Sequence, residues 1–158
     1  MSKSGLFAHF GSKEELQLAT VEAAADVFET QVVEPAANAR GVATLHALVE
    51  AYLRYVQEDV FPGGCFFASA LTELSMQPGP VRDRLVVFFG DWLERLEAAA
   101  REAQADGDID PNEDPGQLAF EIEATLFFAN AQFVVARTSE PIERARRTIE
   151  RRLAAAAA

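Results

Sequence analysis

Apolar residues recur at helical spacing along nearly the whole chain, and turn-forming residues divide it into segments. The alternation of apolar and polar positions that marks half-buried strands is absent. Glycine and proline, with Asp, Asn and Ser, gather at 11–12, 35–41, 62–64, 78–80, 106–115 and 139–141. The pattern predicts an all-α protein with helices over 2–10, 12–33, 42–59, 65–76, 80–105, 114–137 and from 141 onward.

Capping residues support several of these helix starts. Ser12 and Glu15 form a capping box, in which the serine accepts from the first turn and the glutamate reaches back. Asp114 stands at a favoured N-cap position before Pro115. Pro80 likewise suits the first turn of the longest helix.

Each predicted helix has an apolar stripe with which to pack. In helix 114–137 the apolar residues run nearly all round the second half, so we expect it to be covered on more than one side. The stripes of the other helices are Leu16, Ala19, Ala23 and Val27; Leu45, Leu48, Val49, Tyr52 and Val56; Val81, Leu85, Phe88, Phe89, Trp92 and Leu96; and Ile142, Ala145, Ile149 and Leu153.

Composition narrows the class of protein. With 158 residues, 49% of them hydrophobic and 25% charged, the chain is globular and forms one domain, or one domain and a fragment. No apolar run is long enough for a bilayer and no cleavable signal is visible, so we expect a cytoplasmic protein without membrane contact. The net charge of −11 argues against a body that grips nucleic acid over its whole surface.

The most informative stretch is residues 2–16, Ser-Lys-Ser-Gly-Leu-Phe-Ala-His-Phe-Gly-Ser-Lys-Glu-Glu-Leu. It resembles the end of the DNA-binding head of TetR-family transcriptional regulators: a recognition helix, a tight turn and a capped linking helix. The resemblance implies a TetR-like helical bundle. It places a partial helix-turn-helix head at 1–33, with recognition helix 2–10 and linking helix 12–33, and a ligand-binding and dimerisation domain at 34–158.

The same resemblance implies a DNA-contacting set. Small and polar residues would lead the recognition helix into the major groove, while an aromatic, a histidine and a lysine would lie near the phosphates. In the family two further helices precede this one, so we expect tight operator binding only when those helices are present. The DNA-contacting set is Ser2, Lys3, Ser4, Gly5, Phe7, His9 and Lys13.

Members of the family enclose an apolar effector between the middle helices and dimerise through the last two. By resemblance we expect a homodimer and a small, apolar effector, with no cofactor. Aromatic walls with a few polar groups suit such a ligand. The expected pocket residues are Tyr52, Tyr55, Phe66, Phe67, Phe88, Trp92, Phe127 and Asn130, with Phe128 a further aromatic candidate, and the expected interface residues are Leu126, Phe133, Ile142, Ile149 and Leu153.

Other chemistry-bearing patterns have simpler explanations. Cys65 opens a helix and suggests a thiol sensor, but an inert buried thiol is the favoured interpretation. The pair His46 and Glu50 lacks further metal ligands, and the 106–110 acidic run departs from a calcium loop at the glycine and glutamate positions. The arginines of 144–152 fit the solvated face of the last helix. We therefore expect no metal site.

The resemblance to TetR-family regulators implies a repressor that its ligand releases from DNA. An effector-binding and dimerising module without DNA function is the alternative. A small helical enzyme is a weaker alternative, because no nucleophile elbow, phosphate loop or metal-ligand cluster is visible. We accordingly expect no catalytic activity.

Overall fold

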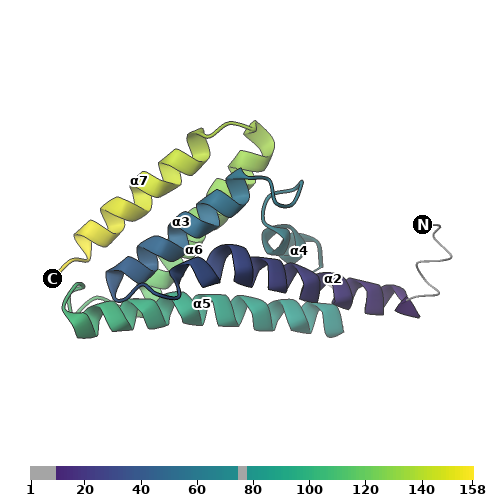
Figure 1. Ribbon diagram of the computed structural model, residues 1–158, viewed down its shortest axis with the longest axis horizontal. Coiled ribbons are helices and arrows are strands. Elements are labelled where there is room, and N and C mark those ends of the chain that lie inside the picture. The colour runs from purple at the N-terminus through teal and green to yellow at the C-terminus, as the bar shows by residue number, and fades with distance from the viewer. Residues whose placement is uncertain (1–9, 75–77) are drawn as a thin grey trace.

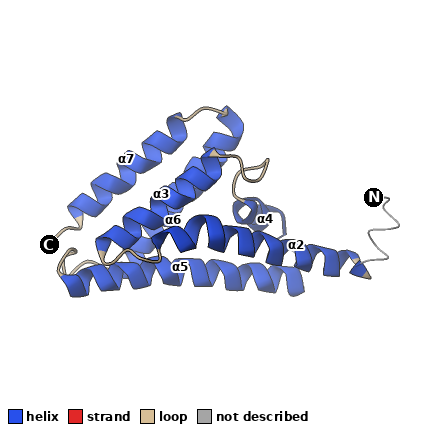
Figure 2. Ribbon diagram, viewed as in Figure 1, coloured by secondary structure: helices blue, strands red, loops and turns tan. Residues whose placement is uncertain are grey.

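The computed structural model describes residues 10–74 and 78–158, and helices dominate both ranges (Figures 1 and 2). Within these ranges no strand forms, and Ile109 and Ala157 make an isolated bridge, so the all-α prediction is confirmed. The expected helix 2–10 lies outside the described residues. The α-helices are α2 (Lys13–Phe28), α3 (Val42–Gln57), α4 (Phe66–Leu74), α5 (Pro80–Asp106), α6 (Pro115–Ala136) and α7 (Glu140–Ala155).

The predicted caps start the helices they were expected to start. The Ser12 hydroxyl accepts from the backbone N–H of Glu15 at 3.0 Å, ahead of α2. The Asp114 carboxylate accepts from the N–H groups of Gly116 and Gln117 at 2.9 and 3.2 Å, ahead of α6. These bonds satisfy donors that the first helical turn leaves without partners.

The helical path of α2 continues past Phe28 with a change of winding. A π-turn, η1 (Glu29–Val33), is followed by a 3₁₀ turn, η2 (Glu34–Ala36). A π-turn is rare and commonly marks a functional position. The predicted end near residue 33 therefore agrees with the path of the chain, but not with a continuous α-helix.

The buried stripe of α2 differs from the prediction. Val21, Ala24 and Phe28 are buried, with Phe28 only 3% exposed. Alanines stand on several faces of this helix, so its periodicity is weak, and the large ring of Phe28 settles which face turns inward. The predicted stripe is partly or fully exposed at all of its positions: Leu16, Ala19, Ala23 and Val27.

Helices α2 and α5 lie side by side along the long axis of the molecule and run in the same direction (Figure 1). Two ion pairs connect them. The Arg84 guanidinium donates to both carboxylate oxygens of Glu22 at 2.7 and 2.9 Å, and Arg95 lies 3.5 Å from Glu29. The linking helix is therefore held against α5 by ion pairs at two positions along its length.

Helix α6 is the central helix, packed against α3, α4, α5 and α7. By length and composition alone it could cross a membrane. It instead buries Leu118, Ile122 and Leu126 against its neighbours and carries two glutamates, Glu121 and Glu123. Its apolar character thus serves the core, which agrees with the prediction that it is covered on more than one side.

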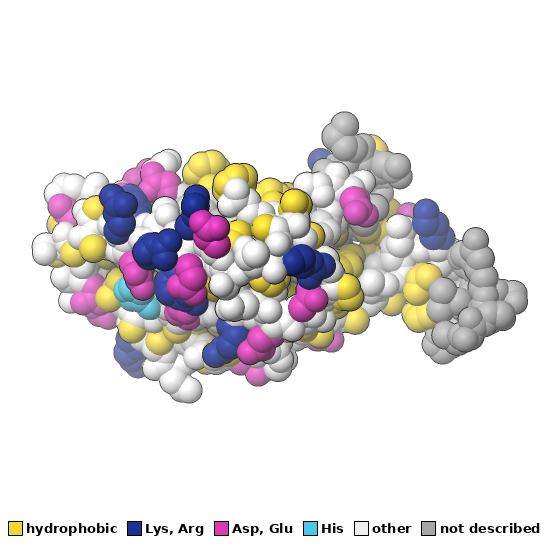
Figure 3. Space-filling model, turned by 90° about the horizontal axis from the view of Figure 1, so that it is seen from above, with side chains coloured by type: hydrophobic (Ala, Val, Ile, Leu, Met, Phe, Trp, Pro, Cys, Tyr) yellow, Lys and Arg dark blue, Asp and Glu magenta, His cyan; other side chains and the backbone are white. Residues whose placement is uncertain are grey.

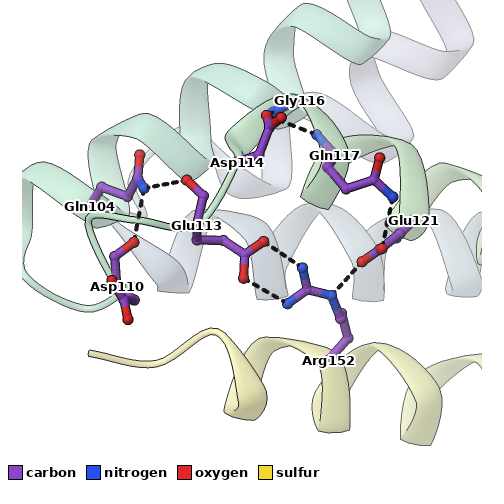
Figure 4. Close-up of polar contacts among 8 residues, drawn as sticks. All are labelled: Gln104, Asp110, Glu113, Asp114, Gly116, Gln117, Glu121 and Arg152. Atoms are coloured by element: carbon purple, nitrogen blue, oxygen red, sulfur yellow. Dashed lines mark hydrogen bonds and ion pairs between the residues drawn. The ribbon is translucent and has the colours of Figure 1, made fainter.

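Helix α7 is tied to α6 by a polar network at its C-terminal end (Figure 4). The Arg152 guanidinium donates to Glu113 at 2.6 and 3.2 Å and also to Glu121. The Gln104 amide donates to the carbonyl oxygens of Asp110 and Glu113, both at 2.9 Å. One network therefore joins α5, α6 and α7.

Three arginines of α7, including Arg152, pair within the chain. Arg146 donates to Glu50 of α3 at 2.7 and 3.0 Å, and Arg144 donates to Glu140 at 2.6 Å. Basic and acidic side chains alternate on the face seen in Figure 3, and no continuous basic patch forms there. Glu50 is thus paired with an arginine of α7, and His46 is exposed.

Candidate functional site

An aromatic cluster gathers where α2, α3, α4 and α5 meet. Phe28 is its centre and meets every other member approximately edge to face, with ring centroids between 5.1 and 6.3 Å apart. Such edge-to-face contacts are the favoured geometry for aromatic pairs. We call this set the aromatic cluster; it consists of Phe28, Tyr52, Tyr55, Phe67, Phe88 and Trp92.

Five of the expected pocket residues therefore come together: Tyr52, Tyr55, Phe67, Phe88 and Trp92. Phe66 lies at the edge of the cluster, 5.3 Å from Phe67, and is half-buried. Phe127 is half-buried on α6 and packs against the core. Phe128 is 63% exposed, because it projects from the side of α6 that faces away from the cluster.

Asn130 has a structural role in the turn before α4. Its side-chain oxygen accepts from the backbone N–H of Cys65 at 2.8 Å in the core. The same oxygen occupies the space that a side chain at Gly64 would need, and Gly64 has a φ of +76°. The side-chain oxygen of Asn130 therefore holds the turn before α4, and the expected role of this residue in a ligand pocket stays a prediction.

Glu123 of α6 is a member of the site that the sequence did not single out. Its carboxylate accepts from the Trp92 indole N–H at 2.7 Å. Burial raises the pKa of this carboxyl to about 7, while the bond from Trp92 works in the opposite direction. A glutamate inside the apolar run of α6, seven residues before Asn130 and so on the same side of the helix, was the available signal.

The other polar groups beside the cluster are neutral. Burial is the main cause that raises the pKa of Cys65 and of Tyr52 above their ordinary values. Burial also raises the pKa of Tyr55, whose hydroxyl has no hydrogen-bond partner of ordinary geometry among the described residues. The inert buried thiol expected at Cys65 agrees with this environment.

The space inside the cluster is small. A cavity of about 10 Å³ remains between rings of the cluster, Cys65 and Glu123. A cavity of this size holds about one water at most. A ligand must therefore displace at least one ring to enter.

A groove between α2 and α5 lies directly outside the cluster. It has a volume of about 270 Å³, and Phe28, Phe88 and Trp92 line both the groove and the inner cavity. The ion pairs Arg84–Glu22 and Arg95–Glu29 lie at its rim. These three aromatic side chains thus lie between the groove and the inner cavity.

A second surface lies on the outer face of α6 and α7. Phe128 and Val135 are 63% and 86% exposed there, beside two shallow grooves of about 460 and 380 Å³. Large apolar side chains exposed together usually mark an interaction surface. Phe120, also on α6, is exposed to the same degree as Phe128.

The side chains expected at the dimer interface are covered by the chain itself. All are buried inside the single chain, because the stripes of α6 and α7 pack against each other and against the core. A partner cannot reach a side chain that its own chain covers. The buried residues are Leu126, Phe133, Ile142, Ile149 and Leu153.

Comparison with known proteins agrees with this architecture. Residues 41–149 match the family described as the tetracycline repressor-like C-terminal domain. The chain belongs to the TetR family.

Solved structures of TetR-type proteins have the same fold. A TetR transcriptional regulator from Chloroflexus aurantiacus J-10-FL superposes with a TM-score of 0.83 and 26% sequence identity, covering 90% of this chain and 73% of its own. A regulatory protein TetR from Rhodobacter sphaeroides gives a TM-score of 0.80 at 22% identity, covering 96% and 81%. Among curated protein sequences, no match is found.

The matched TetR domain begins at Gly41, so α2 and its Phe28 precede it. Phe28 is nevertheless packed in the same core as the matched helices. The division of the chain after residue 33 stays a prediction. In packing terms, the end of the linking helix is part of the effector-domain core.

Most of the expected DNA-contacting set, Ser2 to His9, lies outside the described residues. Lys13 is described and stands exposed in the first turn of α2. The 106–110 acidic run serves the fold: Asp108 accepts from the N–H of Val42 at 3.1 Å, and Asp110 from that of Asn112 at 2.8 Å. In the part of the TetR chain that the structure describes, no group of three or more His, Cys, Asp or Glu side chains could hold a metal ion.

Proposed function

We propose that this TetR-family chain is the sensing and dimerising part of a repressor, and that a small ligand in the aromatic cluster releases the repressor from operator DNA. The observation that carries the proposal is the position of Phe28. It is the last residue of α2 and the centre of the cluster. We infer that a ligand that displaces this ring also shifts the end of the linking helix.

The coupling follows from differential affinity. A ligand shifts a conformational equilibrium only if it binds one arrangement better than the other. A cluster closed around Phe28 has no room for a ligand, whereas a cluster without that ring has room for one. The ligand therefore favours the arrangement in which α2 has moved away from α5.

In this proposal, the displacement is transmitted along α2 to the residues that precede it. Recognition helices of a dimer must match half-sites about 34 Å apart on B-form DNA. A displacement of α2 in each subunit changes that spacing and weakens the complex. Ser2, Lys3, Ser4, Gly5, Phe7, His9 and Lys13 are the proposed contacts with DNA, with Lys13 placed beside the N-terminus of α2.

We further propose a homodimer built on the outer face of α6 and α7. The support is the exposure of Phe128 and Val135 on helices whose other face is already buried. Such a dimer would make α6 a fully covered helix, which its composition favours.

The proposed activity is the binding of DNA, effector and partner subunit. We propose that it takes place in the cytoplasm, where operator DNA is found, and that it needs neither a cofactor nor a catalytic step.

Hydrogen–deuterium exchange tests the proposed coupling. Ligands that raise the melting temperature are first selected from a set of small aromatic compounds. In their presence we expect altered exchange in residues 13–33 as well as around Tyr52 and Trp92. A ligand that protects the cluster and leaves residues 13–33 unchanged would contradict the coupling.

Phe28→Ala supplies the matched control for this experiment. The variant should still bind such ligands, because the cavity is enlarged. It should lose the ligand-dependent change in 13–33, because no ring remains to be displaced. Val87→Ala, at an exposed position of α5, should behave as the parent chain does.

A further inference from the structure

The polar lining of the aromatic cluster indicates which class of effector it takes. Glu123 is the acidic side chain that lines the inner cavity. Its one hydrogen bond described in the structure comes from the Trp92 indole, and no arginine or lysine pairs with it among the described residues. A carboxylate has room for about four hydrogen bonds, so most of its capacity is unused.

Aromatic rings surround this carboxylate. Trp92, its hydrogen-bond donor, stacks nearly parallel to Tyr52 with ring centroids 6.3 Å apart and 19° between the planes. Phe28 closes the space edge-on against both rings. The faces of tryptophan and tyrosine rings attract cations, most strongly where water is excluded.

We propose that the effector is a lipophilic cation, an aromatic or alkyl ammonium whose charged nitrogen lies between Glu123 and the faces of Trp92 and Tyr52. This inference rests on the proposed function, since it names the ligand class of the same cluster. The cation takes the place of the Phe28 ring and supplies the counter-charge that Glu123 lacks. Pairing a partly buried charge in this way removes the penalty of leaving it alone.

The entrance favours the same sign of charge. The groove between α2 and α5 is lined by four carboxylates and two guanidinium groups. Both guanidinium groups are already paired with two of the carboxylates. The two remaining carboxylates, Asp26 and Asp91, leave the rim net negative, which raises the local concentration of cations.

The groups facing Glu123 do not supply a competing charge. Trp92 faces it from α5, Tyr52 from α3 and Cys65 from the turn before α4. Burial raises the pKa of Tyr52 and of Cys65, so both stay neutral near pH 7. The charge state of the inner site therefore follows Glu123, whose pKa is raised to about 7, and a bound cation favours its ionised form.

The test uses three probes of related size and different charge. Benzyltrimethylammonium is the cation, neopentylbenzene is its neutral counterpart with carbon in place of nitrogen, and benzylsulfonate is the anion. Trp92 is the only tryptophan of the chain, so its emission reports binding at this site directly. Titration of Trp92 emission and the shift in melting temperature are both measured for each probe.

We expect the cation to bind at least about tenfold more tightly than its neutral counterpart, and the anion not to bind. Glu123→Gln keeps an oxygen for the Trp92 bond but removes the charge, so it should weaken cation binding about tenfold or more. It should leave neopentylbenzene unaffected. Glu121→Gln makes the same change two residues away, on the Arg152 side of α6, and should leave all three affinities unchanged.

Two results would overturn the inference in different ways. If neopentylbenzene binds as tightly as the cation, or if Glu123→Gln binds the cation as well as the parent chain, the cluster is a ligand site but not a cation site. If none of the three probes changes the emission of Trp92 or the melting temperature, the cluster itself fails as the effector site. That second result would contradict the proposed function as well.

Discussion

The ring of Phe28 meets the Trp92 indole edge to face, with centroids 5.2 Å apart and 83° between the planes. One residue belongs to the linking helix and the other to the long helix beside it. This contact places the end of α2 in the same packed group as the proposed ligand site. The stability of the core and the position of α2 therefore both depend on the side chain of Phe28.

Phe28→Ala should lower the free energy of unfolding by about 3–5 kcal/mol, because it removes a buried ring and leaves a cavity. Urea denaturation followed by circular dichroism measures the loss. Val87→Ala is the control, since its side chain is 54% exposed on α5 and the substitution should change stability by about 0.5 kcal/mol or less. Equal effects at the two positions would show that Phe28 is not the centre of the core.

Glu123→Gln should stabilise the protein at pH 8 by at most about 3 kcal/mol, and this gain should shrink toward zero near pH 4.5. The carboxyl has a pKa of about 7 in the folded chain and an ordinary value of 4.5. The free-energy penalty of burying the Glu123 carboxylate is fully present above pH 7, where the carboxyl is ionised in both the folded and the unfolded chain. The penalty is absent below pH 4.5, where the carboxyl is protonated in both. Urea denaturation of parent and variant across this range measures the difference.

The matched control is Glu121→Gln, whose carboxyl has a lowered pKa because Gln117 and Arg152 donate to it. The pKa shift of Glu121 is therefore opposite in sign to that of Glu123, so Glu121→Gln should not raise the free energy of unfolding at pH 8. A stabilising effect of both substitutions would point to the net charge of −11 as the cause, and not to the environment of Glu123.

Phe128→Glu should convert the proposed dimer to monomers, because it puts a charge in the middle of the apolar face of α6 and α7. Sedimentation velocity should show at least about a hundredfold rise in the dissociation constant. Val87→Glu introduces the same charge at a 54% exposed apolar position of α5 and should leave the dimer intact. Dissociation by Val87→Glu instead would place the interface on α5.

Gly64→Ala should be more destabilising than Gly107→Ala. Both glycines have a positive φ, +76° and +83°, so both substitutions carry the same backbone penalty of about 1 kcal/mol. At Gly107 the new methyl group meets nothing within 4 Å, whereas at Gly64 it meets the side chains of Asn130 and Val134. Thermal denaturation measures the fall in melting temperature of each variant, and the difference between the two gives the steric contribution at Gly64. Equal falls would contradict the tight packing of the turn.

The helix boundaries were predictable from local chemistry. Ser12 and Asp114 start helices because their side chains accept from the first turn, and this needs no information about distant residues. The stripe of α3 was also predictable, since large apolar residues occur on one side of it only. In α2, by contrast, alanines face several directions, so the inward position of Phe28 depends on rings supplied by α3, α4 and α5.

The site was partly predictable for the same reason. Five aromatic residues could be grouped because their type suits a pocket. Glu123 stands out in the sequence only as a glutamate within an apolar run, and its burial beside Trp92 depends on how α5 lies against α6. The interface residues were taken from the apolar side chains of α6, such as Leu126, and from the stripe of α7, of which Ile149 is a member. An apolar stripe in the sequence identifies the helix face that will be buried, but not whether the same chain or a second subunit covers it. Here the stripe of α7 packs on α6 of the same chain.

The π-turn at Glu29–Val33 has a consequence for the direction in which α2 presents its residues. Successive residues of an α-helix are rotated by about 100° about its axis, so one extra residue in a turn changes the angular phase by that amount. The side chains before Phe28 and those after Val33 therefore follow two separate angular registers. Deleting one residue from this turn would rotate the N-terminal end of α2 by about a quarter of a revolution relative to the core, while its length along the axis changed by only about 1.5 Å.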